Sequence, residues 1–160
     1  MSELQGALEG KDRRFAILVS RFNELITDKL LTGARACLLQ HGVAETALDV
    51  IWVPGAWELP GAALHAAHSG RYAGLVAVGC VIRGETPHFD YVAGEAARGL
   101  AGVTLETGVP IGFGVLTTDT VEQALARSGG NKGNKGWEAA LSALEMADLF
   151  NMLGDDNAGA

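Results

Sequence analysis

Short aliphatic runs alternate along the chain with longer segments whose apolar residues recur at helical spacing. Continuous apolar runs are typical of strands buried on both faces of a parallel sheet. They predict four strands, at residues 15–19, 50–53, 75–78 with an extension to 82, and 111–116. The helical spacing predicts helices at residues 25–40, 58–67, 89–105 and 137–152, and a short helix that Thr120 caps and that ends near 127.

Strands that alternate with helices predict an α/β fold, a three-layer α/β/α sandwich around a doubly wound, mostly parallel sheet. With 160 residues, the chain is expected to form one domain, residues 1–160, with extended or flexible termini at about 1–10 and 154–160. Hydrophobic residues make up 48% of the chain and aromatic residues only 6%, so the predicted core is largely aliphatic.

Charge and cysteine content narrow the class of protein. A net charge of −7 argues against a nucleic-acid binder that works through bulk electrostatics. The two cysteines, Cys37 and Cys80, form no Cys-x-x-Cys motif and suit a reducing compartment. No apolar run reaches the roughly 18 residues of a membrane span, and no signal-peptide pattern begins the chain. These features predict a cytoplasmic protein without membrane or nucleic-acid partners.

Polar and conformationally special residues follow each predicted strand. They lie in four segments, residues 21–23, 54–58, 83–88 and 117–120. Because ligands of doubly wound sheets bind beyond the carboxyl ends of the strands, this edge is the predicted site.

The common cofactor and metal motifs are incomplete. No Gly-x-Gly-x-x-Gly follows the first strand, and the Gly-, Asn- and Lys-rich segment 129–136 lacks the spacing of a phosphate-binding P-loop. No serine stands in Gly-x-Ser-x-Gly, and His65 and His68 have no companions that would complete a zinc site. We therefore expect no cofactor and no metal.

The segment 83–88 admits two interpretations. Gly84, Glu85 and Thr86 precede a predicted helix, whose free N–H groups attract anions, and His88 is suited to proton transfer at neutral pH. Alternatively, Thr86 merely caps the helix, Pro87 opens it and His88 is an exposed bystander, which is a common arrangement.

Three further residues are equally ambiguous from their types alone. Phe22 either packs into the core or stacks on a planar ring. Glu58 either favours a helix start or holds sugar hydroxyls, and Arg127 is either a solvated charge or a phosphate clamp.

Five motifs, taken together and in order, resemble the 6,7-dimethyl-8-ribityllumazine synthase family. They are Arg21-Phe-Asn-Glu-Leu-Ile-Thr27, Val53-Pro-Gly-Ala-Trp-Glu-Leu-Pro60, residues 79–92, residues 113–127 and Gly133-Asn-Lys-Gly136. The resemblance extends from about Leu4 to Met152 and implies a flavodoxin-like fold. It also implies condensation of 5-amino-6-(D-ribitylamino)uracil with 3,4-dihydroxy-2-butanone 4-phosphate, the penultimate step of riboflavin synthesis, without cofactor or metal.

The resemblance assigns expected roles. Phe22 stacks on the uracil ring. The ribityl chain contacts Ala56, Trp57 and Glu58. The pyrimidine meets the backbone of Cys80, Val81 and Ile82. The phosphate substrate contacts Glu85 and Thr86, and His88 transfers protons. The neighbouring subunit contributes Phe113, Arg127 and Lys135.

Trp57 and Cys80 differ from the residues usual at these positions in the family. Segment 128–135 also differs in sequence but keeps the usual length. Both single substitutions preserve a backbone contact, although Cys80 adds a thiol that oxidants attack. The resemblance further implies a homo-oligomer with a pentamer as its unit, which we expect to assemble into a 60-mer, and riboflavin synthase as a candidate partner. A flavin-binding module or a cage-forming structural protein of the same fold remains the alternative.

Overall fold

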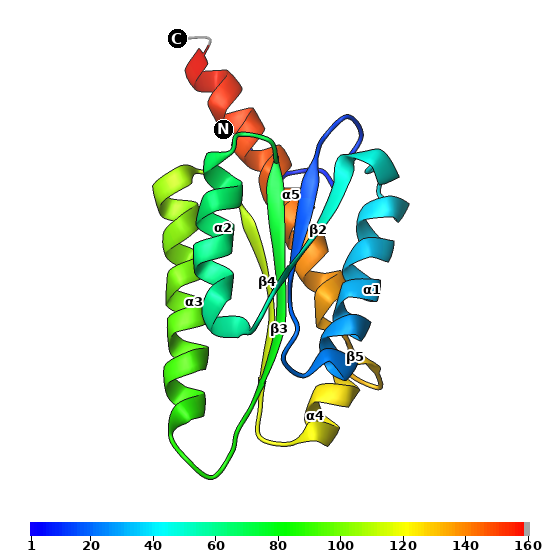
Figure 1. Ribbon diagram of the computed structural model, residues 1–160. Coiled ribbons are helices and arrows are strands. Elements are labelled where there is room, and N and C mark those ends of the chain that lie inside the picture. Colours follow the sequence, from blue (N-terminus) through cyan, green and yellow to red (C-terminus); the bar gives the residue numbers. More distant parts are fainter. Residues whose placement is uncertain (159–160) are drawn as a thin grey trace.

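Four parallel strands form the centre of the computed structural model, which describes residues 1–158. The strands are β1 (Phe15–Ser20), β2 (Leu48–Val53), β3 (Gly74–Ile82) and β4 (Ile111–Thr118). Their spatial order is β2-β1-β3-β4, so the winding reverses between β1 and β3 (Figure 1). This is the strand order of flavodoxin-like sheets, and the predicted fold class is confirmed.

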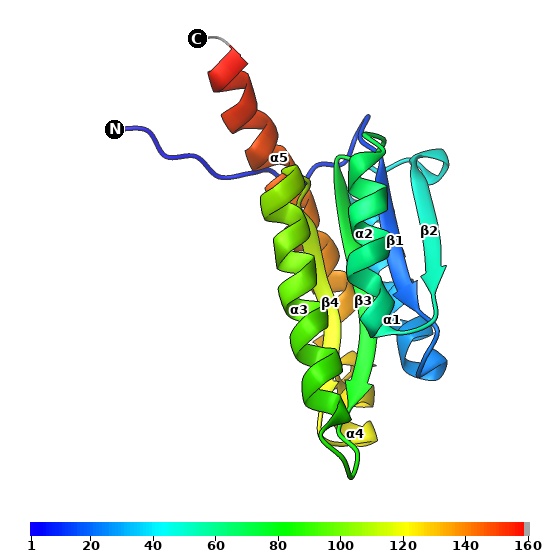
Figure 2. The same ribbon diagram turned by 60° about the vertical axis from the view of Figure 1, so that its left-hand side comes forward.

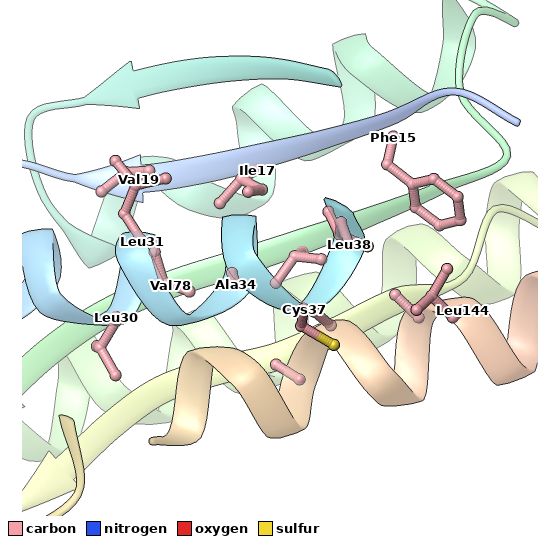
Figure 3. Close-up of a cluster of buried hydrophobic side chains, with 14 of the residues drawn as sticks. Phe15, Ile17, Val19, Leu30, Leu31, Ala34, Cys37, Leu38, Val78 and Leu144 are labelled. Carbon is pink, nitrogen blue, oxygen red and sulfur yellow. The ribbon is translucent and has the colours of Figure 1, made fainter. Parts of the chain in front are cut away.

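Helices cover both faces of the sheet (Figures 1 and 2). One face carries α1 (Glu24–Gln40) and α5 (Lys135–Ala158); the other carries α2 (Leu59–His68) and α3 (His88–Thr107). Successive residues of β1 point to opposite faces, as in any strand. Phe15, Ile17 and Val19 therefore pack with α1 and α5 (Figure 3), whereas Ala16 and Leu18 pack with α2 and α3. Burial of every β1 side chain explains the unbroken apolar run.

The elements after β4 differ from the prediction. The short helix α4 (Val121–Ala126) has the expected Thr120 cap, which Gln123 completes as a capping box. The following segment, where the sequence predicted no strand, is a small antiparallel hairpin of β5 (Ser128–Gly130) and β6 (Gly133–Asn134). Helix α5 begins two residues earlier than predicted and continues to Ala158 instead of ending near 152.

The remaining segments are short. Two 3-10 turns, η1 (Glu45–Ala47) and η2 (Ala56–Glu58), flank β2. Residues 1–10 form neither helix nor strand and extend past α5 (Figure 2), where the Ala7 N–H donates to the Asp148 carboxylate at 2.7 Å. Between residues 1 and 158, no helix has both the length and the apolar character needed to cross a membrane.

Two glycines bring α5 against its neighbours. A Cβ on Gly112 of β4 would overlap the Ala139 carbonyl, and one on Gly136 would overlap the Leu30 carbonyl of α1. Any larger residue at either position forces a backbone to move. The start of α5 is therefore fixed closely against both the sheet and α1.

Candidate active site

The loops that follow the four strands gather at one edge of the sheet, the lower end of the molecule in Figure 1. The loop after β1 is joined to the loop after β2 by two backbone hydrogen bonds. Arg21 N–H donates to Val53 O at 2.8 Å, and Phe22 N–H donates to Pro54 O at 3.0 Å. These bonds hold the backbone of Phe22 while leaving its side chain 70% exposed, which is unusual for a phenylalanine without a partner.

Phe22 and Glu58 both lie close to Gly55. A Cβ on Gly55 would lie 3.5 Å from Glu58 Oε2 and 4.0 Å from Phe22 Cβ. The structure thus brings together two residues that the sequence placed 36 positions apart. Two residues of η2 separate Gly55 from Glu58 in the sequence. Of these, Ala56 is buried and Trp57 is 58% exposed. An aromatic face and a carboxylate on one small surface can accept a planar ring and a hydroxylated chain.

Strand β3 extends beyond its neighbour β1. It pairs with β1 only as far as Val78, opposite Val19, but with β4 as far as Ile82, opposite Thr118. The backbone groups of residues 79–82 that face β1 therefore have no strand partner. Unpaired N–H and C=O groups at a strand edge are a template for planar polar ligands. This edge lies where the winding of the sheet reverses, the usual ligand position in such folds.

One side chain reaches this free edge. Asn23 Nδ2 donates to Cys80 O at 2.9 Å, and Asn23 itself adopts a left-handed conformation with φ 64°. The left-handed region is unfavourable for most residues, but asparagine tolerates it. Asn23 therefore joins the Phe22 loop to β3. Asn23 was not among the site residues predicted from the sequence, although its position beside Phe22 was a signal.

Cys80 offers its backbone groups to the candidate site, but its thiol is not reactive. Its side chain is 2% exposed, and burial raises the pKa of the thiol to about 11. The nucleophilic and oxidisable form is the thiolate, which this shift suppresses. The expectation that Cys80 adds a site of oxidation does not suit this environment.

Native protein is therefore expected to react with iodoacetamide at pH 8 about 100-fold more slowly than the same chain in denaturant. Cys37 is also buried with a pKa raised to about 11, so both thiols are expected to resist and to react faster as the pH rises toward 11. Mass spectrometry of the alkylated protein measures both rates. Equal rates in native and unfolded protein would contradict this account.

The segment 83–88 lies wholly on the surface. Within the described chain, the side chains of Glu85, Thr86 and His88 make no hydrogen bond or ion pair. Helix α3 begins at His88 with Pro87 at the cap position and no side-chain cap. The alternative in which Thr86 caps this helix is thus wrong, because its hydroxyl caps nothing. The first turn of α3 leaves N–H groups toward this surface, where an anion can bind.

Phe113, Arg127 and Lys135 gather elsewhere on the chain, around a cavity of about 510 Å³. Its full lining consists of Phe113, Val115, Leu116, Thr117, Arg127, Lys132, Lys135 and Glu138. Lys135 N–H donates to Arg127 O at 2.8 Å across the hairpin, which places the two cationic residues together. Lys132 and Glu138 were not among the site residues predicted from the sequence. The spacing of Glu138, one helical turn after Lys135, was a signal for the latter.

The two groups of predicted site residues are therefore separate on one chain. None of Phe22, Glu58 and His88 lines the cationic cavity. The described part of the chain also contains no cluster of three or more His, Cys, Asp or Glu side chains able to hold a metal ion.

A doubly wound sheet with its polar loops gathered at the switch point defines a small-molecule-binding α/β protein. A family model described as 6,7-dimethyl-8-ribityllumazine synthase matches residues 12–151. The 6,7-dimethyl-8-ribityllumazine synthase of Chlorobium luteolum (strain DSM 273 / BCRC 81028 / 2530) is 51% identical over 150 residues, which cover 94% of this chain and 97% of that one. The chain belongs to this family, and the expected enzyme class, a transferase of riboflavin biosynthesis, is confirmed.

Proposed function

We propose that the carboxyl edge of the sheet condenses 5-amino-6-(D-ribitylamino)uracil with 3,4-dihydroxy-2-butanone 4-phosphate to give 6,7-dimethyl-8-ribityllumazine. The free edge of β3 beside Phe22 is the observation that carries this proposal. The pyrimidine meets the backbone of residues 80–82, its ring stacks on Phe22, and its ribityl chain runs toward Ala56, Trp57 and Glu58. The hydrogen bonds from Phe22 N–H to Pro54 O and from Asn23 Nδ2 to Cys80 O join the Phe22 loop both to the loop that leads to Glu58 and to the free part of β3.

The phosphate substrate binds at the segment before α3. The N–H groups beside Glu85 and Thr86 and the start of α3 suit its dianion. The amine of the uracil attacks the ketone to form an imine with loss of water, phosphate then leaves, and ring closure releases a second water. Each step moves protons, and His88 is the group within this segment that can exchange them. Proximity contributes further to the rate enhancement, because both reactants are held at one edge.

The separate cationic cavity supports a site shared between two chains. Arg127 and Lys135 carry the positive charge that the phosphate requires, yet they line a cavity to which Phe22, Glu58 and His88 do not contribute. In a cyclic homo-oligomer, the cavity of one chain meets the carboxyl edge of the next around the whole ring. We propose a pentamer as this ring and a 60-mer as the assembled form.

Incubation of the protein with both substrates tests the proposal, because the lumazine product has its own absorbance and fluorescence. Product formation is the expected result. Tight binding of a flavin without turnover of the two substrates would favour the alternative of a flavin-binding module.

Two single substitutions are expected to separate the two substrates. Arg127→Ala removes a charge-assisted contact worth about 1.5–3 kcal/mol, so KM for the butanone phosphate rises about tenfold to 100-fold. Phe22→Ala weakens the aminouracil instead, since it removes the stacking surface. Steady-state kinetics with each substrate varied in turn measures both effects. Equal losses for both substrates in both variants would contradict the assignment.

A further inference from the structure

One arginine joins the two ends of the exposed segment that carries Glu85, Thr86 and His88. Arg83 is the first residue after β3, and its N–H donates to Thr118 O at 2.8 Å, one step beyond the last β3–β4 pair. Its backbone therefore continues the sheet. From this fixed point its side chain turns toward the other end of the segment, where α3 begins.

The Arg83 guanidinium contacts three groups on two different elements. Its Nη1 lies 3.5 Å from Asp90 Oδ1, and its Cζ lies 4.4 Å from the centre of the Phe89 ring, both in the first turn of α3. Its Nε donates to Asp119 Oδ1 at 2.8 Å, in the loop after β4. The planar guanidinium suits this task, because it can donate in two directions while stacking on a ring.

Asp119 is itself held by the next helix. Its N–H donates to Gln123 Oε1 at 2.8 Å, and Gln123 completes the capping box of α4. A chain of contacts thus runs from the α3 start through Arg83 and Asp119 to α4, which leads directly into Arg127. Asp119 raises the pKa of Arg83, so the guanidinium stays charged.

Exposed ion pairs contribute little to global stability, and Arg83 is about half exposed. Their effect on a local segment is different when that segment has few other contacts. The side chains of Glu85, Thr86 and His88 make no hydrogen bond or ion pair within the described chain. The position of the segment therefore depends on its two ends, and Arg83 joins those ends.

We propose that Arg83 is a positioning residue that preorganises the His88 segment for the phosphate-bearing substrate. This proposal rests on the function proposed above for the His88 segment. Arg83 sets the separation of β3 and the α3 start and aligns both with the Asp119 loop, so that His88 and the free N–H groups keep one arrangement before substrate arrives. Preorganised groups do not have to be ordered at the moment of binding, which favours both binding and turnover.

The Arg83→Met variant tests the proposal, because methionine keeps an unbranched chain of similar reach and loses all donors. We expect kcat/KM for the butanone phosphate to fall about tenfold, while the dissociation constant of the aminouracil stays unchanged. Arg83→Lys is expected to recover little, since one ammonium cannot bridge both carboxylates and stack on Phe89. Asp119→Asn is expected to lower the same ratio and to add little when combined with Arg83→Met.

Arg71→Met is the matched control. Arg71 also stacks on a following aromatic ring, Tyr72 at 5.7 Å, and lies 3.8 Å from a carboxylate, Asp49, but it precedes β3 at the opposite edge of the sheet. It changes net charge equally and is expected to leave the kinetics unaltered. Unchanged kinetics in Arg83→Met, an equal loss in Arg71→Met, or an equal loss of aminouracil binding would each overturn the proposal.

Hydrogen exchange provides a readout that does not require turnover. The peptide 83–92 contains the Arg83 N–H, which donates to Thr118 O, and the Asp90 N–H, which donates to Pro87 O. Faster exchange of this peptide in Arg83→Met, and in Asp119→Asn, with the rest of the chain unaltered, is expected even if the wild-type protein forms no lumazine. Absent turnover in the wild type would reject the proposed function alone, whereas unchanged exchange would reject the role of Arg83.

Discussion

Co-expression of His88→Ala chains with Arg127→Ala chains in equal amounts is expected to yield assemblies with about a quarter of wild-type activity. A shared site is intact only where one chain keeps His88 and its neighbour keeps Arg127. Random assembly around a closed ring produces this pairing at about one interface in four. Each parent alone carries a lesion at every site. Activity per chain, measured from lumazine fluorescence at a butanone phosphate concentration well below the KM of the wild type, therefore rises well above either parent.

A second mixture serves as the control. Arg127→Ala and Lys135→Ala chains carry their lesions in the same cavity, where the two residues are joined by a backbone hydrogen bond. Every neighbour then lacks one of the two cationic side chains, so mixing is expected to give only the average of the parents. If the first mixture also gives only that average, both His88 and Arg127 serve a site on one chain and the shared site is wrong.

Replacement of His88 by alanine is expected to slow turnover by about 100-fold or somewhat less, the lower part of the range for general acid–base catalysis. Binding of the aminouracil is expected to change little, because Phe22 and Glu58 lie on other loops. Single-turnover kinetics separates the chemical step from binding. His65→Ala removes an exposed histidine from α2 and is expected to have no effect. Turnover unchanged in His88→Ala would make His88 a bystander.

The central sheet could be predicted because its physical signal is local. Each strand contains a run of mostly apolar residues, and residues such as Phe15 and Ile17 are buried because helices cover both faces. The hairpin after α4 has no such run. Its turns depend on the positive φ of Gly129 and Gly133, which composition suggests only as a loop. Asn134, which accepts from Trp137 N–H at 3.1 Å, explains the early start of α5.

The candidate site, like the fold, has features that could be predicted from the sequence and features that could not. The loops that carry it could be predicted because polar residues follow each strand, and parallel strands end at one edge. The free edge of β3 could not, because it depends on how far β1 pairs with it, and periodicity does not set register. The contacts from Asn23 to Cys80 and from Arg83 to Asp119 join residues 57 and 36 positions apart. Only the folded chain reveals such pairs.

The close approach of α5 to the sheet also bears on how this protein can be redesigned. Gly112 and Gly136 let backbone carbonyls occupy the space of a side chain, so the wall that carries Lys135 and Glu138 cannot retreat to admit a bulkier reactant. Libraries aimed at new ketone phosphates should therefore leave both glycines untouched and vary lining residues outside α5, such as the exposed Phe113 and Lys132. We therefore expect selectivity in this enzyme to change more readily through Phe113 and Lys132 than through the residues of α5.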